Sequence, residues 1–359
     1  MHPLQRRAFL LSLAAGGSAL QAPAHALPAR ALVFPRDHGA HPDLRTEWWY
    51  VTGQARAGNA PSGREFGFQV TFFRSRIDAA RDLASAFAAR QLVFAHAAIT
   101  DVQGRRLWHD QRIAREGFGI AQAAQDDTRL ALRDWTLVRE ADGAYRARIP
   151  ASEFSLDLRF APTQPVLLQG TGGLSRKGPE PRQASYYYSQ PQLQAGGRLQ
   201  VGERAFDVTG RAWLDHEWSE ELLHPQAVGW DWIGMNLEDG SALTAFRLRR
   251  ADGSALWDGG SWRGPRGPAR AFDAGRTAFT PQRHWLSPRS GAHYPVQWQV
   301  DCPAGRYIVR PLVDDQELDS RTSTGAIYWE GLSELTNAQG ETLGRGYLEM
   351  TGYARPLRL

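Results

Sequence analysis

Apolar and polar residues alternate along much of the chain. An apolar residue occupies every second position from Phe66 to Phe72, and the same spacing recurs in residues 154–160 and 294–300. A period of two places each such set on one face of a β-strand. Polar residues fill most of the positions in between, which is typical of antiparallel sheets with one buried face. The pattern therefore predicts an all-β protein.

Turn signals separate the predicted strands, and helix signals are few. Asp-Gly pairs at Asp142-Gly143, Asp239-Gly240 and Asp252-Gly253 predict tight turns. The Ala-rich stretch Asp78–Arg90 is the one place where we expect a helix, inside an insertion between strands. Many short strands with turns between them are typical of β-barrels or sandwiches.

The length of the chain predicts two such domains. At roughly 150 residues per domain, 359 residues correspond to two units. The residue pattern of the sequence changes around residues 215–226. We therefore place the domain boundary there and expect domains at residues 27–220 and 221–359. Closed barrels have no exposed strand edges, and an eight-stranded barrel can hold one apolar ligand.

The first 26 residues are typical of an export signal. Arg6-Arg7 precede a short apolar run, and Ala24-His25-Ala26 offers a small-x-small cleavage site. Paired arginines predict the twin-arginine pathway, with a Sec signal as the alternative. No later segment has 18 uninterrupted apolar residues, so we expect no membrane span. These features predict a periplasmic or secreted protein.

Composition narrows the classes of chemistry. The 42 basic residues exceed the 38 acidic ones by only four, and they are scattered, so we expect no nucleic-acid partner. The single cysteine, Cys302, excludes an intramolecular disulfide and a thiolate zinc site. A Gly-rich nucleotide loop and a Gly-x-Ser-x-Gly motif are both absent. We therefore expect no cofactor and no α/β-type serine hydrolase.

The main candidate residues form two runs rich in tryptophan: Asp215, His216, Glu217 and Trp218, then Trp230, Asp231 and Trp232. In a strand, Asp215 and Glu217 share one face and His216 points away, whereas a turn brings all three together. Such a set can supply an acid, a base and an orienting partner. A divalent metal site and a capped turn with a His–Asp hydrogen bond are the alternatives.

Three further residues are weaker candidates. Glu47 precedes Trp48 and other aromatic residues, and burial against rings raises a carboxyl pKa, which makes a proton donor. Its alternative role is a salt bridge to an arginine. Tyr187 could orient a substrate or serve as barrel packing, and His96 lies in an apolar strand, where histidines are usually structural.

Six segments resemble one known family. They are FPRDHGAHPDLRTEWWYVTG (34–53), ASYYYSQPQL (184–193), WLDHEWSEE (213–221), GWDWIGMNLEDGSAL (229–243), YWEG (328–331) and GRGYLEMTGY (344–353). These segments are similar to the AttH / carotenoid 1,2-hydratase (CrtC-like) family, over about residues 32–356. The resemblance implies two lipocalin-like antiparallel β-barrel domains in tandem.

The resemblance also implies a reaction. The family's characterised chemistry is the hydration of a terminal isoprenoid double bond in acyclic carotenes, without a redox cofactor. His216 and Trp218 match its His-x-Trp element. The strand that carries a Tyr and an Asp in the hydratases reads Leu243–Leu248 here and contains no acid. The proton donor is then left to Asp215, Glu217, Asp231 or Glu47.

Two functions remain open. The first is a hydratase-like enzyme for an elongated apolar ligand, an isoprenoid or a lipid, with Asp215, His216 and Glu217 as acid/base residues. Its pocket would be lined by Glu47, Trp48, His96, Tyr187, Trp218, Trp230, Asp231 and Trp232. The second is a non-catalytic lipid carrier or chaperone that works with a membrane transporter. A carboxyl of raised pKa that faces the cavity next to His216 favours the enzyme, and carboxyls paired with arginine at the rim or between the domains favour the carrier.

Overall fold

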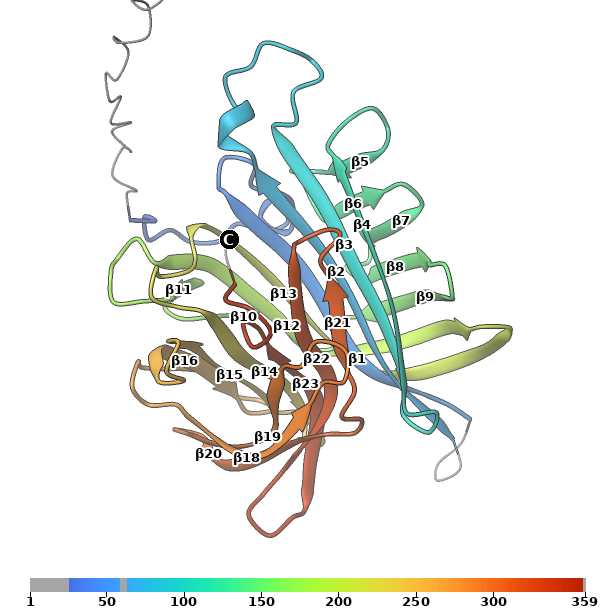
Figure 1. Ribbon diagram of the computed structural model, residues 1–359, viewed down its shortest axis with the longest axis vertical. Coiled ribbons are helices and arrows are strands. Elements are labelled where there is room, and N and C mark those ends of the chain that lie inside the picture. Colours follow the sequence, from blue (N-terminus) through green and yellow to red (C-terminus); the bar gives the residue numbers. More distant parts are fainter. Residues whose placement is uncertain (1–25, 59–62, 358–359) are drawn as a thin grey trace, which may run out of the picture.

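The computed structural model describes residues 26–58 and 63–357, and they form two antiparallel sheets (Figure 1). The all-β prediction is confirmed. Residues 1–25 of the predicted export signal lie outside the described residues. Two short 3₁₀ turns are the helical elements of the described chain, η1 (Arg36–His38) and η2 (Asp78–Ala80).

The first sheet has thirteen strands. They are β1 (Thr46–Ala57), β2 (Arg64–Arg76), β3 (Gln91–Asp101), β4 (Arg106–Arg115), β5 (Ala121–Ala123), β6 (Arg129–Leu132), β7 (Trp135–Arg139), β8 (Tyr145–Pro150), β9 (Phe154–Ala161), β10 (Leu167–Leu168), β11 (Leu174–Arg176), β12 (Ala184–Val201) and β13 (Arg204–Glu221). Their order is β4-β3-β2-β1-β13-β12-β9-β8-β7-β6-β5, and β10 and β11 pair with β12. The ends of the sheet meet where β3 and β4 contact β5 and β6, which gives a nearly closed barrel.

The second sheet has ten strands. They are β14 (Gly229–Leu237), β15 (Ala242–Arg249), β16 (Ala255–Arg263), β17 (Ala269–Phe272), β18 (Ala278–Leu286), β19 (His293–Cys302), β20 (Gly305–Pro311), β21 (Glu317–Ser320), β22 (Ala326–Thr336) and β23 (Thr342–Met350). Their order is β17-β16-β15-β14-β23-β22-β20-β19-β18, and β21 pairs with β22. The chain passes from the first sheet to the second between Glu221 and Gly229.

Each domain has its own packed interior. Side chains such as Trp49, Trp135 and Phe68 fill the first barrel, and Trp298 and Trp329 belong to the second core. All five are at most 1% exposed. Large aromatic side chains therefore occupy both interiors.

A third apolar layer lies between the two domains. Tyr50 and Trp213 from the first sheet pack there with Trp232, Leu332 and Tyr347 from the second. This layer explains why several strands are buried on both faces. On β2 the predicted set from Phe66 to Phe72 is fully buried, but the intervening Gln69 and Thr71 are also buried because they face the second domain.

The expected helix at Asp78–Arg90 does not form. The segment contains only η2 and continues as an irregular loop, with Leu83 and Phe87 exposed. A short helix is marginal in water unless one of its faces packs against the protein, and this segment has no such face. The Asp-Gly turns form as predicted, with Gly143, Gly240 and Gly253 at φ values between 84° and 87°.

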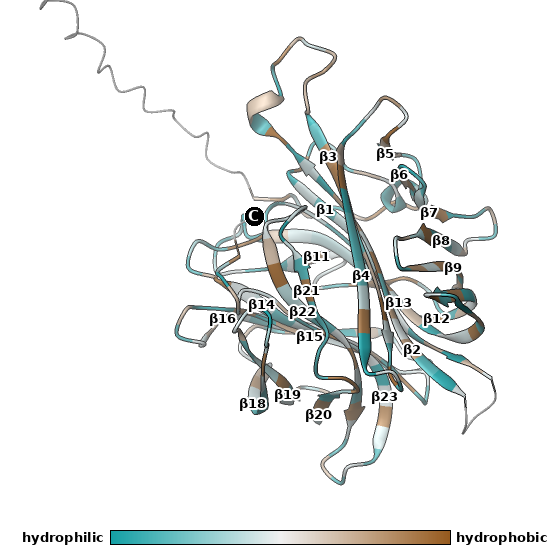
Figure 2. Ribbon diagram, turned by 45° about the vertical axis from the view of Figure 1, so that its right-hand side comes forward, coloured by the Kyte–Doolittle hydropathy of each residue, from teal (hydrophilic) through white to brown (hydrophobic). Residues whose placement is uncertain are grey.

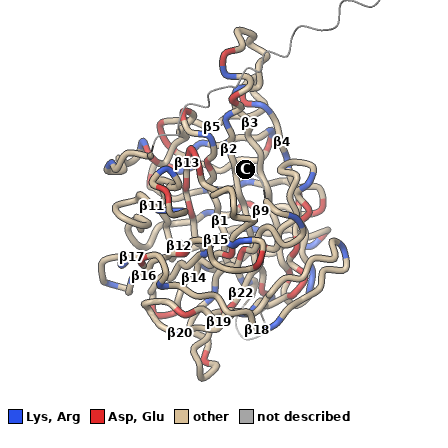
Figure 3. The backbone as a smooth tube through the Cα atoms, turned by 60° about the vertical axis from the view of Figure 1, so that its left-hand side comes forward, with Lys and Arg blue, Asp and Glu red and all other residues tan. Residues whose placement is uncertain are grey.

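Surface charge is mixed. Figure 3 shows Lys and Arg interspersed with Asp and Glu over the tube. Cys302 is a free thiol among the described residues. Within those residues, helices long and apolar enough to cross a bilayer are absent.

Candidate functional site

A cavity of about 760 Å³ lies between the two domains. Strands β1, β2, β3, β12 and β13 supply one wall through their outward faces, and β14, β15, β22 and β23 supply the other. Most of the exposed lining residues, which mark the mouth, lie in the segment after β2, in the turn before β22 and near the C-terminus: Asp78, Ala79, Arg321, Thr324, Gly325, Arg355 and Pro356. The sequence left open whether a ligand cavity would lie inside a barrel or between two, and the structure places this one between them.

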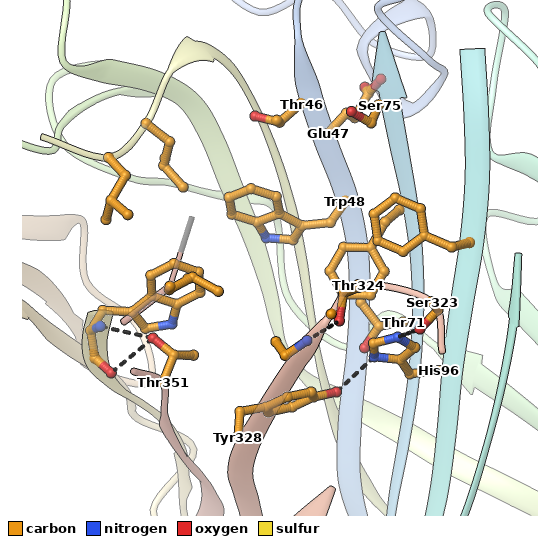
Figure 4. Close-up of a pocket in the computed structure, with 18 of the residues that line it drawn as sticks. Thr46, Glu47, Trp48, Thr71, Ser75, His96, Ser323, Thr324, Tyr328 and Thr351 are labelled. Atoms are coloured by element: carbon orange, nitrogen blue, oxygen red, sulfur yellow. Dashed lines mark hydrogen bonds between the residues drawn. The ribbon is translucent and has the colours of Figure 1, made fainter. Parts of the chain in front are cut away.

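The cavity wall is largely aromatic. Trp48, Phe73 and Phe94 come from the first sheet, and Trp230, Trp232 and Phe246 come from the second. Figure 4 shows the Trp48 indole projecting into the space between the sheets. Flat apolar walls of this kind suit an elongated apolar ligand, and ring faces stabilise a positive charge that develops beside them.

Asp215 on β13 lies in this wall and is 3% exposed. Its carboxylate accepts hydrogen bonds from Ser189 Oγ (2.5 Å), Trp213 Nε1 (2.7 Å) and the Tyr187 hydroxyl (2.8 Å). Burial raises the pKa of Asp215 to about 7, outweighing these hydrogen bonds. All three donors are neutral, so no cation directly stabilises the charged form.

Glu217, two residues further along β13, has a different partner. The Lys177 Nζ lies 2.9 Å from Glu217 Oε1, and Ser185 Oγ donates to the same oxygen. Lys177 follows β11 and also lies over the rings of Tyr187 and Phe246, 4.7 and 4.3 Å from their centroids. The ammonium and the carboxylate therefore form a buried ion pair inside the cavity wall.

The second domain contributes two more carboxyls, which sequence reasoning missed. Glu330 and Glu349 are cross-strand partners on β22 and β23, and both line the cavity. Burial raises the pKa of Glu349 to about 7, and the charges of Asp215 and Glu217 add to the effect. Burial and the charge of Glu349 also raise the pKa of Glu330 well above its usual value.

Glu349 is the more accessible of these two acids. It is partly exposed, whereas Glu330 is 2% exposed and accepts a hydrogen bond from Gln69 Nε2 at 2.7 Å. Among the described residues, only a hydrogen bond from the Trp230 indole favours the charged form of Glu349. Both glutamates lie in the YWEG and GRGYLEMTGY segments that carried the family resemblance, and this was the available signal.

His96 also lines the cavity, as predicted for a pocket residue. Its Nδ1 lies 2.8 Å from the Tyr328 hydroxyl and its Nε2 lies 2.8 Å from Ser323 Oγ (Figure 4). Burial lowers the pKa of His96 to about 3. The neutral imidazole thus joins the two domains through hydrogen bonds and carries no charge at neutral pH.

His216 does not line the cavity. Because Arg204–Glu221 is a strand, its side chain points to the opposite face from Asp215 and Glu217, into the first barrel. It is fully buried, stacks on Trp49 with ring centroids 4.4 Å apart, and lies 2.9 Å from Glu47 Oε1. The expectation that a ligand lies beside this imidazole is therefore wrong, and the same holds for Trp218, which stacks on His41 at 4.0 Å.

Glu47 borders the cavity, but its carboxylate belongs to the barrel interior. Arg74 Nε donates to Glu47 Oε2 at 2.8 Å, which is the salt bridge anticipated as the alternative role. Burial alone would raise the pKa of Glu47, but hydrogen bonds from His216 and His41 outweigh it and hold the pKa well below its usual range. Glu47 is thus ionised and unsuited to donate a proton.

The same cluster contains the one group of potential metal ligands found in the described residues. Ligand atoms of His41, Glu47 and His216 lie within 4.8 Å of one another. Both imidazoles already bond to Glu47 Oε1, and the Arg74 guanidinium bonds to the other carboxylate oxygen. A cation beside that guanidinium would be repelled, so the arrangement fits a hydrogen-bonded ion network better than a metal site.

Asp231 also points away from the cavity. Its carboxylate accepts hydrogen bonds from Arg247 Nε at 2.7 Å and from the Tyr353 hydroxyl at 2.8 Å. It is fully buried and absent from the cavity lining. Of the predicted residues, the structure brings together at the cavity Asp215, Glu217, Trp48, His96, Tyr187, Trp230 and Trp232.

Comparisons with known proteins agree with this architecture. A solved structure of a protein assigned as AttH from Nitrosomonas europaea is 48% identical, with a TM-score of 0.84, over 91% of this chain and 99% of that one. Kievitone hydratase from Nectria haematococca is 12% identical, with a TM-score of 0.69, over 90% and 94%. CghA in complex with Sch210972 is 13% identical, with a TM-score of 0.52, over 86% and 88%.

The two distant structures establish the shared fold alone. No curated protein matches the chain. The AttH-like family matches residues 25–353, which is nearly the whole chain. The protein is therefore a member of the AttH-like family, built from two lipocalin-like β-domains in tandem.

Proposed function

We propose that the protein is a cofactor-independent hydratase that adds water to a carbon–carbon double bond of an elongated apolar molecule, an isoprenoid or a lipid. The ligand lies in the cavity between the domains. One observation carries the proposal: Glu349, a carboxyl with a pKa of about 7, opens into a cavity walled by tryptophan rings. The fold shared with kievitone hydratase agrees with this class of reaction.

The proton comes from Glu349 rather than from Asp215. Three hydrogen bonds from protein donors already occupy the two carboxylate oxygens of Asp215, so this carboxyl is not directed at a ligand. Glu349 is partly exposed, and its raised pKa lets it keep its proton at a pH at which an ordinary carboxyl has lost it. A general acid is most effective when its pKa lies near the working pH.

The proposed hydration needs only one carboxyl group, because the same group gives and then regains a proton. Protonated Glu349 gives its proton to one alkene carbon, and a carbocation forms at the other. Water attacks this cation, and the Glu349 carboxylate takes up the proton that the water releases, so the sum is alkene plus water to alcohol. The rings of Trp48, Trp230 and Trp232 stabilise the cation through their faces.

Asp215 and Tyr187 act as positioning residues. The Tyr187 hydroxyl donates to Asp215 and lies 3.3 Å from Trp232 Nε1, so the pair fixes the Trp232 indole. Negative charge on Asp215 also raises the pKa of Glu349. Loss of the Asp215 charge should therefore lower the pH at which the enzyme loses its acid form.

The test is turnover of acyclic isoprenoids with a terminal double bond, run in deuterium oxide and in heavy-oxygen water. The proposal expects an alcohol with one new carbon-bound deuterium and one oxygen from water. Glu349→Gln should reduce the rate by about a hundredfold or more, the usual contribution of a general acid. Glu341→Gln, which changes an exposed glutamate of the same domain, should leave the rate unchanged.

A lipid carrier is the competing function, and the Lys177–Glu217 ion pair is the observation that favours it. A carrier keeps its carboxyls neutralised and returns its ligand unchanged. Native mass spectrometry of the protein purified from its host separates the two. A bound lipid that survives incubation intact, with no product from any isoprenoid, would replace the hydratase by the carrier.

We also propose that the protein acts outside the cytoplasm, after export through its paired-arginine signal. Supply of an apolar substrate there implies a link to a membrane transporter. Fractionation of cells that express either the unmodified chain or a double variant, Arg6→Lys with Arg7→Lys, tests the export route. Unchanged delivery of the double variant would exclude the twin-arginine pathway.

A further inference from the structure

Most of the exposed apolar side chains gather at one end of the molecule. Eight large apolar residues of the described chain are exposed, and five of them share this end: Leu83, Phe87, Ile113, Phe118 and Ile120, at 38% to 71% exposure. They come from the loop of residues 77–90 after β2, and from the end of β4 with the turn into β5. Figure 2 shows both loops at the same end. We call these five residues the apical patch.

The two phenylalanines are fixed around an arginine. The rings of Phe87 and Phe118 stack with centroids 5.5 Å apart and an interplanar angle of 10°. The Arg115 guanidinium carbon lies 5.4 Å from the Phe87 centroid and 4.1 Å from that of Phe118, and Arg115 also donates to the Phe87 carbonyl oxygen at 2.9 Å. The rings are thus presented to solvent in a defined arrangement.

Phe118 is held in a strained conformation. Its φ of +57° lies in the left-handed region, between Gly117 at +103° and Gly119 at +68°. A bulky residue adopts this conformation at an energetic cost, and the cost persists where the surrounding structure enforces it. Burial cannot be the reason here, because Phe118 is 56% exposed. The turn therefore exposes the Phe118 ring to solvent even though its backbone conformation costs local stability.

The apical patch is continuous with the cavity mouth. Ile113 belongs to both the patch and the cavity lining. Ile77 and Ala79, at the start of the loop that carries Leu83 and Phe87, also line the mouth. A surface that covered the patch would therefore lie directly against the entrance of the cavity.

We propose that the apical patch inserts into the interface of a phospholipid bilayer, so that an apolar ligand passes from the membrane into the cavity without crossing water. The two segments carry three arginines, Arg81, Arg90 and Arg115, and three acids, Asp78, Asp82 and Glu116, so their formal charge is balanced. Asp78 is ion-paired with Arg76. Binding therefore rests on the apolar side chains, and the arginines can pair with lipid phosphates once the loops lie at the headgroups.

The size of the patch argues against a second copy as the occupant. Five partly exposed side chains present a few hundred Å² at most, whereas a specific interface needs roughly 800 Å² per partner. Loop tips with aromatic and aliphatic residues beside arginine are typical of surfaces that enter the headgroup region of a membrane.

The inference rests on the proposed apolar ligand, and its test is independent of turnover. The purified full chain is sedimented with vesicles of phosphatidylcholine, alone and with roughly one third phosphatidylglycerol. Phe87→Ser and Phe118→Ser should each lower the partition coefficient by about tenfold, since a buried phenyl ring contributes at least that much. Leu286→Ser is the matched control, because Leu286 is 55% exposed on β18, outside the patch, and should change nothing.

Three results would overturn the inference: no binding to either vesicle, binding that both phenylalanine variants retain, or self-association of the free protein that these variants abolish. Hydration of a short, water-soluble isoprenoid should be unaffected by Phe87→Ser. Vesicle binding without hydration by the unmodified chain would reject the proposed function alone. Hydration without vesicle binding would reject the membrane surface alone.

Discussion

The stability of an Asp215→Asn variant relative to wild type should increase as the pH rises from 4 to 8. In the unfolded chain the carboxyl has its ordinary pKa of about 3.9, whereas burial raises it to about 7 in the folded protein. Below pH 4 the group is protonated in both states. As pH rises through this window, only the unfolded state releases its proton, so the folded state loses stability up to about pH 7.

The size of the effect follows from the shift. About three pKa units at 1.36 kcal/mol each give about 4 kcal/mol as an upper value for the full window. The amide introduced by Asp215→Asn does not titrate, so its own pH-independent effect on hydrogen bonding to Tyr187 cancels when two pH values are compared. The difference in unfolding free energy between variant and wild type should therefore grow by about 2 to 4 kcal/mol from pH 4 to pH 8.

Urea unfolding followed by tryptophan fluorescence measures this difference. Glu217→Gln is the matched control, two residues away on the same face of β13. It leaves Lys177 buried without its partner and should destabilise the protein by about 3 to 5 kcal/mol. If the stability gap between the Asp215→Asn variant and wild type is the same at both pH values, Asp215 has an ordinary pKa and the cavity wall is wetter than the structure indicates.

Three further outcomes are expected. Glu47→Gln should lower the free energy of unfolding by about 3 kcal/mol in the same urea assay, because Arg74 then loses its buried charged partner. A variant as stable as wild type would contradict the stabilising role of this ion network. The buried neutral imidazole of His96 should contribute a loss of stability as pH falls from about 6.5 to about 3, because only the unfolded chain takes up its proton in this range; the stability of His96→Phe relative to wild type should therefore rise as pH falls, measured by pH-dependent unfolding. Phe246→Trp should fill part of the cavity and weaken binding of a fluorescent apolar probe by about tenfold or more without lowering the melting temperature; undiminished binding would place the ligand elsewhere.

The sequence carried much of the fold but only part of the site. Alternation predicted the buried faces of β2, β9 and β19, and the Asp-Gly turns between strands formed as expected. For residues 215–217 it left two possibilities open, a turn that brings all three side chains together and a strand with His216 on the opposite face, and the structure has the strand. The alternation could not say which face meets the ligand, because both faces of β13 are buried.

The missing information is long-range. Glu47 contacts His216 although the two residues are 169 positions apart in the sequence, and no local sequence pattern predicts that contact. Glu349 alternates with apolar neighbours, as a solvent-facing residue of a strand would. It becomes a cavity acid only because the first domain packs over β23. The alternation of residues along one strand does not show which other part of the protein packs against that strand.

The two faces of β13 show why burial alone does not define an acid. Glu47, beside His216 on the inner face, and Asp215 on the outer face are both almost completely buried. The inner carboxylate receives the Arg74 guanidinium and two imidazoles, and its pKa falls. The outer one receives two hydroxyls and an indole, which are neutral, and its pKa rises. The inner network therefore stabilises the barrel as a fixed ion cluster. On the outer face Lys177 is paired with Glu217, and Asp215, which has only neutral partners, keeps its proton to a higher pH.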